Sequence, residues 1–263
     1  STLPLLVDVR GVADPVSLVV QSPLQTTEAA VDDGSRRIAL SGAITSVTPV
    51  DNDGSESVTV VVSGVPVGFR LEGLTFMGGV GTDRIWSGTP AEISTAKLVV
   101  SDANFSGTIN LTVRAVSTEN DGNSLSGAAI PLTIQVTPSP EATIAVQTDA
   151  AEDTLTQVNF AIQPQNGDGN ETLHSVWIDA NSLAGKPFAL YLGGTLLSAA
   201  LPVSGGWYKL DAAQAANVFV KGLANSDADG SFIIKYEIRD PSSDGTLPAT
   251  ITQFDGTHTV NVS

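Results

Sequence analysis

Two acidic turns contain the residues best suited to chemistry. Asp51, Asp53 and Glu56 fall within six positions, and Asp168 and Glu171 repeat that arrangement 115 positions later (168 − 53). Closely spaced carboxylates with backbone carbonyls between them offer the oxygen ligands that Ca²⁺ prefers. Such strings also form ordinary turns, because Asp and Asn accept left-handed backbone geometry. Neither string has the spacing of an EF-hand loop. A cation site and a plain turn are both open at this point.

Catalytic chemistry has few candidates. The chain has no cysteine and only two histidines, His174 and His258, so a base that titrates near neutral pH is scarce. Both histidines fall in or beside strand-like runs, and we predict that they are surface strand residues. No nucleophile elbow, phosphate-binding glycine loop or zinc-protease motif occurs. Paired acids could hydrolyse glycosides, but aromatic residues that would stack on sugars make up only 5% of the chain. We therefore expect no enzyme activity.

The charge balance restricts the partners. Twenty-eight acidic and 12 basic residues give a net charge of −16, which argues against nucleic acid or an anionic membrane as the partner. The acidity could simply keep an exposed protein soluble, or it could gather around divalent cations. No run of 18 apolar residues occurs, so we expect no membrane insertion. The start, Ser1-Thr2-Leu3-Pro4, lacks Met and a signal-peptide pattern, which is what an excised fragment would show.

The sequence repeats itself, which bears directly on the fold. Besides the acidic turns, Trp86 recurs as Trp207 at a spacing of 121 (207 − 86). Ser101-Asp102-Ala103 recurs as Ser226-Asp227-Ala228 at a spacing of 125 (226 − 101). The repeated motifs occur in the same order in both halves, but the spacing between the two copies differs slightly from motif to motif. This pattern indicates conserved strands joined by loops of variable length.

A closing strand appears three times, at Leu5–Val9, Leu132–Val136 and Thr259–Val262. The chain is long enough for two complete repeats, each ending in one such strand. The first of the three copies therefore belongs to a preceding repeat. The predicted units are residues 1–10 as that remnant, 11–137 as the first repeat and 138–263 as a second, divergent repeat. Proline near both boundaries predicts short, stiff linkers.

Within each repeat the apolar residues alternate with polar ones. The clearest runs are Ile109–Ala115, Val58–Val62 and Phe232–Ile238. This alternation predicts half-buried strands of antiparallel sheets. Helices are expected only at Asp211–Ala216, with Asp211 as N-cap, and at Pro90–Ile93. We predict an all-β chain of two tandem immunoglobulin-like (cadherin-like) β-sandwiches, each of about seven strands, arranged as an extended rod.

This fold would gather the acids at the ends of the sandwiches. The chain start, the B–C loop and the F–G loop share one end of such a sandwich, and the A–B and E–F loops share the other. The candidate metal ligands are Asp14, Asp51, Asp53, Glu56, Glu119 and Asp121 at the leading end of the first repeat, Asp33 and Asp102 at its other end, and Glu141, Asp168, Glu171 and Asp240 at the leading end of the second. If the repeats stack, carboxylates of both converge at the joint, and their repulsion would be relieved by bound Ca²⁺.

The three tryptophans divide into two groups. Trp86 and Trp207 occupy matching repeat positions, and we predict that both are core residues. Trp177 has no counterpart in the first repeat, so core packing and a ligand-binding platform remain alternatives for it.

At several motifs the sequence resembles the immunoglobulin-like (cadherin-like) tandem repeats of giant bacterial RTX adhesins and biofilm-associated surface proteins. The motifs are Val12-Ala13-Asp14-Pro15, Glu152-Asp153-Thr154, the Asp51–Glu56 turn, Ser63-Gly64-Val65-Pro66-Val67-Gly68 and Phe105-Ser106-Gly107-Thr108. The similarity covers nearly the whole chain and is weaker in the second repeat, whose linker reads Ser139-Pro140-Glu141.

The resemblance implies a calcium-rigidified spacer of a large secreted adhesin at the bacterial cell surface. Such a spacer projects a distal ligand-binding region for attachment and biofilm formation. Its partners would be the neighbouring repeats of the same chain, and the protein would be a monomer. The alternative is a calcium-dependent module in which the second repeat itself binds a host or surface glycan or protein. A repeat from a secreted multidomain enzyme is a third possibility.

Overall fold

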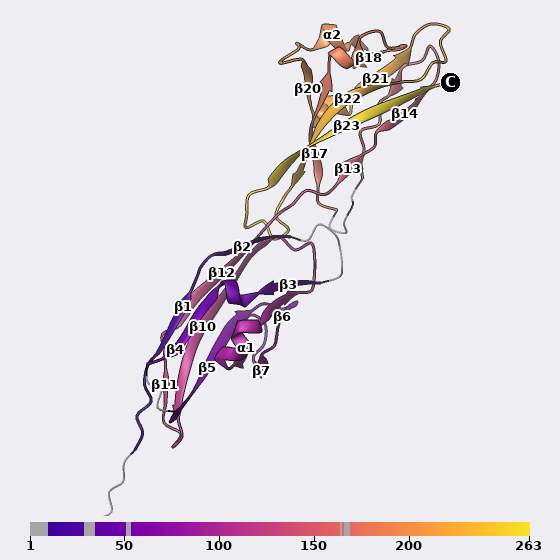
Figure 1. The fold of residues 1–263 in the computed structure, drawn as a ribbon. Helices are drawn as coiled ribbons and strands as arrows, with labels where there is room; N and C mark the ends of the chain where they lie inside the picture. Colours follow the sequence, from indigo (N-terminus) through magenta and orange to yellow (C-terminus); the bar gives the residue numbers. More distant parts are fainter. Residues whose placement is uncertain (1–9, 29–34, 51–53, 164, 166–168) are drawn as a thin grey trace, which may run out of the picture. The chain divides into compact units, whose positions relative to one another are not determined.

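The protein is described by a computed structural model that covers residues 10–28, 35–50, 54–163, 165 and 169–263 (Figure 1). The chain divides into two compact units, Ser1–Thr137 and Pro138–Ser263. The predicted remnant strand at residues 1–9 lies outside the described residues. No helix in the described ranges is long and apolar enough to span a membrane.

Unit 1 is built almost entirely of strands. They are β1 (Val16–Val20), β2 (Leu24–Thr27), β3 (Arg36–Ala39), β4 (Ile44–Pro49), β5 (Glu56–Val65), β6 (Phe69–Glu72), β7 (Thr75–Gly78), β8 (Arg84–Gly88), β9 (Lys97–Val100), β10 (Gly107–Glu119), β11 (Ser124–Ser126) and β12 (Ile130–Thr137). The main sheet has the order β2-β12-β10-β5-β8-β7, with β11 paired to β10, and β3-β9-β6 and β1-β4 form two smaller sheets. A 3₁₀ turn, η1 (Leu40–Gly42), and one helix, α1 (Pro90–Thr95), complete the unit.

Unit 2 has the same kind of construction. Its strands are β13 (Thr143–Ile144), β14 (Gln147–Ala150), β15 (Thr156–Gln157), β16 (Ile162–Gln163), β17 (Thr172–Asp179), β18 (Phe188–Leu192), β19 (Thr195–Leu196), β20 (Trp207–Asp211), β21 (Val218–Gly222), β22 (Gly230–Asp240) and β23 (Thr250–Val262). The sheets are β14-β23-β22-β17-β20, β15-β21-β18-β19 and β13-β16. The short helical segments are η2 (Asn181–Leu183), α2 (Leu197–Ala200) and α3 (Ala212–Ala215).

Nearly all neighbouring strands run antiparallel, and the two parallel pairs are β12 with β2 and β14 with β23. The alternation predicted for β10 and β22 is confirmed, because Ile109, Leu111 and Val113 are buried on one and Phe232 and Ile234 on the other. Each unit has its own apolar core between its sheets. The predicted fold class, tandem immunoglobulin-like sandwiches, is confirmed.

Both predicted helices form, and both begin with reciprocal capping. Thr89 accepts from the Glu92 amide, and the Glu92 carboxylate accepts from the Thr89 amide. In α3, Asp211 and Gln214 make the same exchange. Capping of this kind satisfies two amides that a helix start leaves without intrahelical partners.

Two sequence predictions about single side chains are wrong. His258 is not a surface residue: it is fully buried between Phe160 and Phe232, with ring centroids 5.1 and 5.2 Å away. Trp207 is not a core residue, because β20 turns Tyr208 and Leu210 inward and leaves Trp207 half-buried on the outer face. Trp86, by contrast, is buried as predicted, and His174 is exposed as predicted.

Candidate functional site

The candidate site of unit 2 lies where β17 begins and β22 ends. The two strands are paired antiparallel with Thr172 opposite Arg239, so Glu171 and Asp240 meet one step beyond that pair. Glu171 is 7% exposed and Asp240 is 0% exposed. Figure 1 shows these strand ends beside the chain segment that leads into β13. Sheet pairing therefore buries two carboxylates together at the leading end of the unit.

The Glu171 side chain ties the leading segment of unit 2 to the sheet. Its Oε1 accepts hydrogen bonds from the backbone amides of Glu141 (2.7 Å) and Ala142 (2.8 Å). Amide donors stabilise a carboxylate, but here they reach only one of its two oxygens. The arrangement fixes the path of the linker and leaves half of the carboxylate unused.

Several oxygens at this end are buried with no hydrogen-bond donor among the described residues. They are Glu171 Oε2, Asp240 Oδ1, Asp240 Oδ2 and Asn170 Oδ1. Asn170 also donates from Nδ2 to the carbonyl of Pro241 at 3.2 Å, which places its amide beside Asp240. Within the described chain, neither carboxylate forms an ion pair with a lysine or arginine. Buried charge without a partner is costly, so these oxygens are candidate ligands for a cation.

Unit 1 has the same plan at its leading end. Glu56 begins β5, Glu119 ends β10, and the two are directly paired in the sheet register. Like charges directly opposite one another destabilise a strand pair. Glu56 Oε1 accepts from the backbone amide of Asp14, and Glu56 Oε2 is buried with no hydrogen-bond donor among the described residues. The half-satisfied glutamate of unit 2 thus has a counterpart in unit 1.

The leading segment of unit 1 is held at a second point. Asp121 Oδ2 accepts from the Gly11 amide at 3.2 Å, and Asn123 Nδ2 donates to the Gly11 carbonyl at 3.1 Å. A Cβ on Gly11 would lie 2.8 Å from Cδ of Glu119. A larger residue at this position would therefore displace the end of the Glu119 side chain. Four acids, Asp14, Glu56, Glu119 and Asp121, surround this short stretch of chain.

The predicted metal ligands thus separate into three groups. Asp14, Glu56, Glu119 and Asp121 lie at the leading end of unit 1, and Glu141, Glu171 and Asp240 lie at that of unit 2, where Asp14 and Glu141 contact the glutamates through their backbone amides. Asp102 is apart from them: it precedes β10, whereas Glu119 ends that 13-residue strand, and its Oδ1 accepts the Asn104 amide at 3.0 Å. Asp33, Asp51, Asp53 and Asp168 lie outside the described residues.

Sequence reasoning missed two amides that belong to these ends, Asn170 and Asn123. Asn170 stands between Asp168 and Glu171 in the acidic turn, so its position inside the string was the signal that could have found it. Asn123 carried no signal of its own, because its role depends on the tight turn between β10 and β11, where its amide donates to Asp121 Oδ1 at 2.9 Å.

The side chains at these ends could offer a cation only oxygen ligands. The described residues contain no group of three or more His, Cys, Asp or Glu side chains placed to hold a metal. Where β17 begins and β22 ends, the buried oxygens without a donor among the described residues include those of Glu171, Asp240 and Asn170. Calcium accepts carboxylate, amide and backbone carbonyl oxygens at flexible geometry, so this donor set fits Ca²⁺ better than a metal that prefers nitrogen or sulfur.

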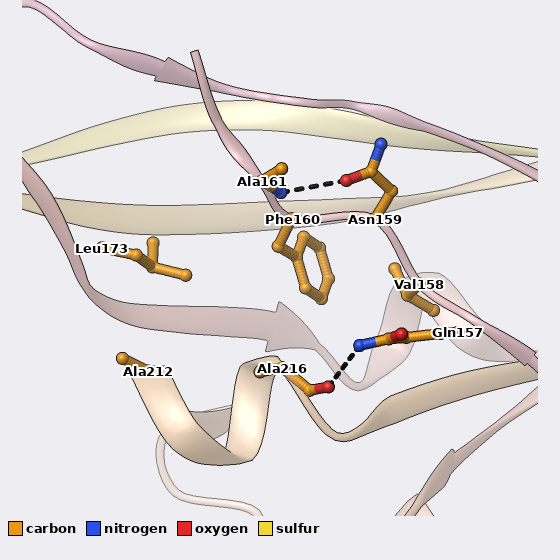
Figure 2. Close-up of a pocket in the computed structure, with 8 residues that line it drawn as sticks. All are labelled: Gln157, Val158, Asn159, Phe160, Ala161, Leu173, Ala212 and Ala216. Atoms are coloured by element: carbon orange, nitrogen blue, oxygen red, sulfur yellow. Dashed lines mark hydrogen bonds between the residues drawn. The ribbon is translucent and has the colours of Figure 1, made fainter. Parts of the chain in front are cut away.

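A separate groove in unit 2 is shown in Figure 2. It has a volume of about 370 Å³ and lies between residues 157–161 and helix α3. Gln157 Nε2 donates to the Ala216 carbonyl at 2.6 Å, and the Ala161 amide donates to Asn159 Oδ1 at 3.1 Å. The lining residues are Gln157, Val158, Asn159, Phe160, Ala161, Leu173, Ala212 and Ala216. None of the eight can act as an acid, a base or a nucleophile near neutral pH.

Comparison with known proteins gives only distant structural similarity. No family model matches the chain, and no curated protein matches it. Human mucin-like protocadherin EC1-2 superposes with a TM-score of 0.31 at 10% identity, covering 95% of this chain and 99% of that one. The adhesive subunit of the CFA/I fimbria of enterotoxigenic Escherichia coli gives 0.25 at 13% identity, with 95% and 93% covered. The fibronectin(III)-like modules of Clostridium thermocellum CbhA give 0.23 at 9% identity, with 95% and 94% covered. Superpositions this loose transfer no function, which has to follow from the chain's own residues.

Proposed function

We propose that this chain is a calcium-rigidified spacer of a large secreted bacterial adhesin of the RTX type, at the bacterial cell surface. In this proposal each unit binds Ca²⁺ at its leading end, and the ion fixes the linker to the sandwich that follows. The chain would work as a monomer whose partners are the neighbouring repeats of the same polypeptide. Its length and stiffness would hold a distal binding region away from the cell.

One observation supports this proposal most strongly. In both units a glutamate at the start of an equivalent strand, Glu56 or Glu171, uses one oxygen to hold the linker amides and leaves the other buried without a donor. In both units a second carboxylate, Glu119 or Asp240, stands opposite that glutamate. A plain acidic turn would leave its carboxylates in water, where they would cost nothing.

A bound cation would explain why these carboxylates persist. It would compensate the buried charge that two neighbouring acids carry. Its ligands would include the same carboxylates that already hold the linker. Extracellular modules bind Ca²⁺ with dissociation constants of roughly 10⁻⁴–10⁻³ M. At a concentration of about 100 times the dissociation constant, one site would stabilise its unit by about 2.7 kcal/mol.

The test is differential scanning calorimetry of the whole chain in excess Ca²⁺, in Mg²⁺ and in EDTA. We expect Ca²⁺ to raise the melting temperature by several degrees. The stability of the Asp240→Asn variant relative to wild type should reverse with conditions. The variant should be more stable than wild type in EDTA, because a buried charge is gone, and less stable in Ca²⁺, because a ligand is gone. Asp255→Asn removes an exposed carboxylate from the same unit and serves as the control.

Two outcomes would contradict the calcium site. One is a wild type whose melting is the same in Ca²⁺ and EDTA. The other is an Asp240→Asn variant that responds to Ca²⁺ as strongly as wild type, which would mean that Asp240 is not a ligand of the ion. Small-angle scattering tests the spacer function separately. We expect the particle dimensions to be more variable in EDTA than in Ca²⁺. If Ca²⁺ binds without changing these dimensions, the ion stabilises its unit but does not stiffen the chain, and the spacer function fails.

The alternative, a calcium-dependent glycan- or protein-binding module with unit 2 as its binding surface, has one observation in its favour. Trp177 stands half-buried on the outer face of β17, while Tyr208, its expected companion, is 7% exposed and belongs to the core. A glycan array probed with and without Ca²⁺ separates the two functions, because only the alternative predicts glycan binding that requires Ca²⁺.

A further inference from the structure

The outer face of the large sheet of unit 2 carries a compact group of aromatic and basic side chains. Trp177 of β17 is paired with Lys209 of β20 on one side and with Lys235 of β22 on the other. Trp207, two residues before Lys209, points to the same side because side chains alternate along a strand. We name these four residues, Trp177, Trp207, Lys209 and Lys235, the Trp–Lys face.

Each indole of the Trp–Lys face lies under an ammonium group. Lys209 Nζ is 4.6 Å from the ring centroid of Trp177, and Lys235 Nζ is 4.7 Å from that of Trp207. Cation–π contacts at such distances are attractive, but they leave the ammonium hydrogens available. Neither lysine has an ion pair in the described part of the chain. The face thus carries two ammonium groups without ion pairs, on either side of Trp177, in a chain of net charge −16.

The Trp177 ring is fixed in position by its neighbours. Its Nε1 donates to Ser175 Oγ at 3.1 Å, and that hydroxyl donates to Glu237 Oε2 at 2.5 Å. A ring held in this way loses little conformational freedom when a ligand stacks on it. The face is therefore preorganised, and its two lysines are the parts that can move.

Unit 1 shows that the fold does not require such a face. The residue that stands at the position of Trp177 is Val61, which is paired with Ser87 and Arg114. Ile85, two residues before Ser87, stands where unit 2 has Trp207. The same sheet positions in the two units thus carry different chemistry, and the Trp–Lys face is a feature of unit 2 alone.

We propose that the Trp–Lys face binds an acidic polysaccharide. Pyranose rings carry apolar C–H faces that stack on indoles, and the ammonium groups would leave the rings to pair with carboxylate or sulfate groups of the polymer. The sheet face accommodates an extended chain that crosses β22, β17 and β20. This site is distinct from the cation sites, so the inference does not rest on the proposed spacer function.

Acidic side chains border the face and limit what it can bind. They are Asp179, Asp211, Glu237 and Asp255. Asp179 accepts the Asn181 amide, Asp211 caps α3 and Glu237 accepts from Ser175. Asp255 stands opposite Lys235 in the register. A polymer with a charge on every unit of a flexible backbone would meet these acids, whereas a glycan offers hydroxyl groups to them between its charges.

The experiment is a titration of the whole chain in EDTA, followed by tryptophan fluorescence. Trp86 is buried in unit 1 and supplies a constant background. The probes are polygalacturonate, which has pyranose rings and carboxylates, dextran, which has rings alone, and poly-L-glutamate, which has carboxylates alone. We expect a saturable change with polygalacturonate that weakens as salt is added. The Lys209→Gln/Lys235→Gln double variant should bind about tenfold more weakly or worse.

The matched control is Lys221→Gln, which removes one positive charge from β21 in the opposite sheet. It should bind like wild type, and Trp177→Leu should reduce the fluorescence change, leaving only the contribution of Trp207, and should weaken binding in a pull-down assay. The inference is overturned if poly-L-glutamate binds as well as polygalacturonate, if dextran binds as well, if Lys221→Gln is as damaging as the double variant, or if no probe binds. Unchanged melting of every variant shows that each is folded.

Discussion

Acid should destabilise unit 2 through one residue, His258. The imidazole is 0% exposed, stacks on Phe232, meets Phe160 edge-on, and contacts Thr148 Oγ1 through Nε2 at 2.8 Å. Nδ1 has no hydrogen-bond partner among the described residues. Burial in this apolar position lowers the pKa of His258 from 6.5 to about 4, because desolvation disfavours the charged ring.

The magnitude follows from the difference between the two pKa values. An unfolded chain takes up the proton as the pH falls through 6.5, whereas the folded unit resists until about pH 4. Above pH 6.5 neither state is protonated and the histidine contributes no pH dependence. Between those values stability falls by up to about 1.36 kcal/mol per pH unit, for a total loss of about 3 kcal/mol that levels off below pH 4.

The assay is urea unfolding of the wild type and of His258→Gln at half-unit steps from pH 7.5 to pH 3.5. Glutamine keeps a partner for Thr148 and stays neutral, so the variant should be less stable at pH 7 but should lose about 3 kcal/mol less on acidification. Carboxylates contribute equally to both proteins and cancel in the difference. His174→Gln, at an exposed position of the same unit, is the control. Parallel pH curves for wild type and His258→Gln would refute the reasoning.

Further predictions concern unit 1. Gly11→Ala should weaken the calcium response of unit 1 and leave its melting temperature in EDTA nearly unchanged, because the new Cβ, 2.8 Å from Cδ of Glu119, would displace that carboxylate. Calorimetry with and without Ca²⁺ measures both quantities, and an unaltered calcium response would mean that the position of the Glu119 carboxylate does not matter for binding. Leu132→Ala, at 0% exposure, should cost about 2–5 kcal/mol in urea unfolding, whereas Leu125→Ala, at 41% exposure, should cost far less. Thr89→Ala should cost about 1 kcal/mol through loss of the α1 cap, and no loss would mean that the cap is replaced by water.

Much of the fold could be predicted because its signals are local. Alternation over Ile109–Ala115 depends only on the two-residue period of a strand, and the structure follows it. The caps at Thr89 and Asp211 depend on residues three positions apart. The pairing of Glu56 with Glu119 is different, since its register is set by the packing of whole strands, and the sequence places those residues only in neighbouring loops.

The wrong prediction for Trp207 comes from an alignment of the two repeats that is one residue out of step. The buried pair Val62–Trp86 of unit 1 corresponds to the buried pair Ile178–Tyr208 in unit 2. Trp207 precedes Tyr208 and so lies on the outer face of β20, because side chains alternate along a strand. In β17 the extra step is a bulge between Leu173 and Ser175 in its pairing with β22, whereas β5 has no irregularity in its pairing with β10.

The same bulge places Trp177 on the outer face. Trp177 follows Glu171 by six residues (177 − 171), as Val62 follows Glu56 (62 − 56), so a regular strand of the same sequence would turn Trp177 inward. Deleting His174 should remove the bulge and leave the later pairs unchanged, because Leu173–Ile238 and Ser175–Glu237 already follow one another in β22. We therefore expect the deletion variant to keep Trp177 opposite Lys235 on the outer face and to melt close to wild type. A deletion variant in which Trp177 becomes buried and unit 2 loses several kcal/mol would show that β17 changes its register instead.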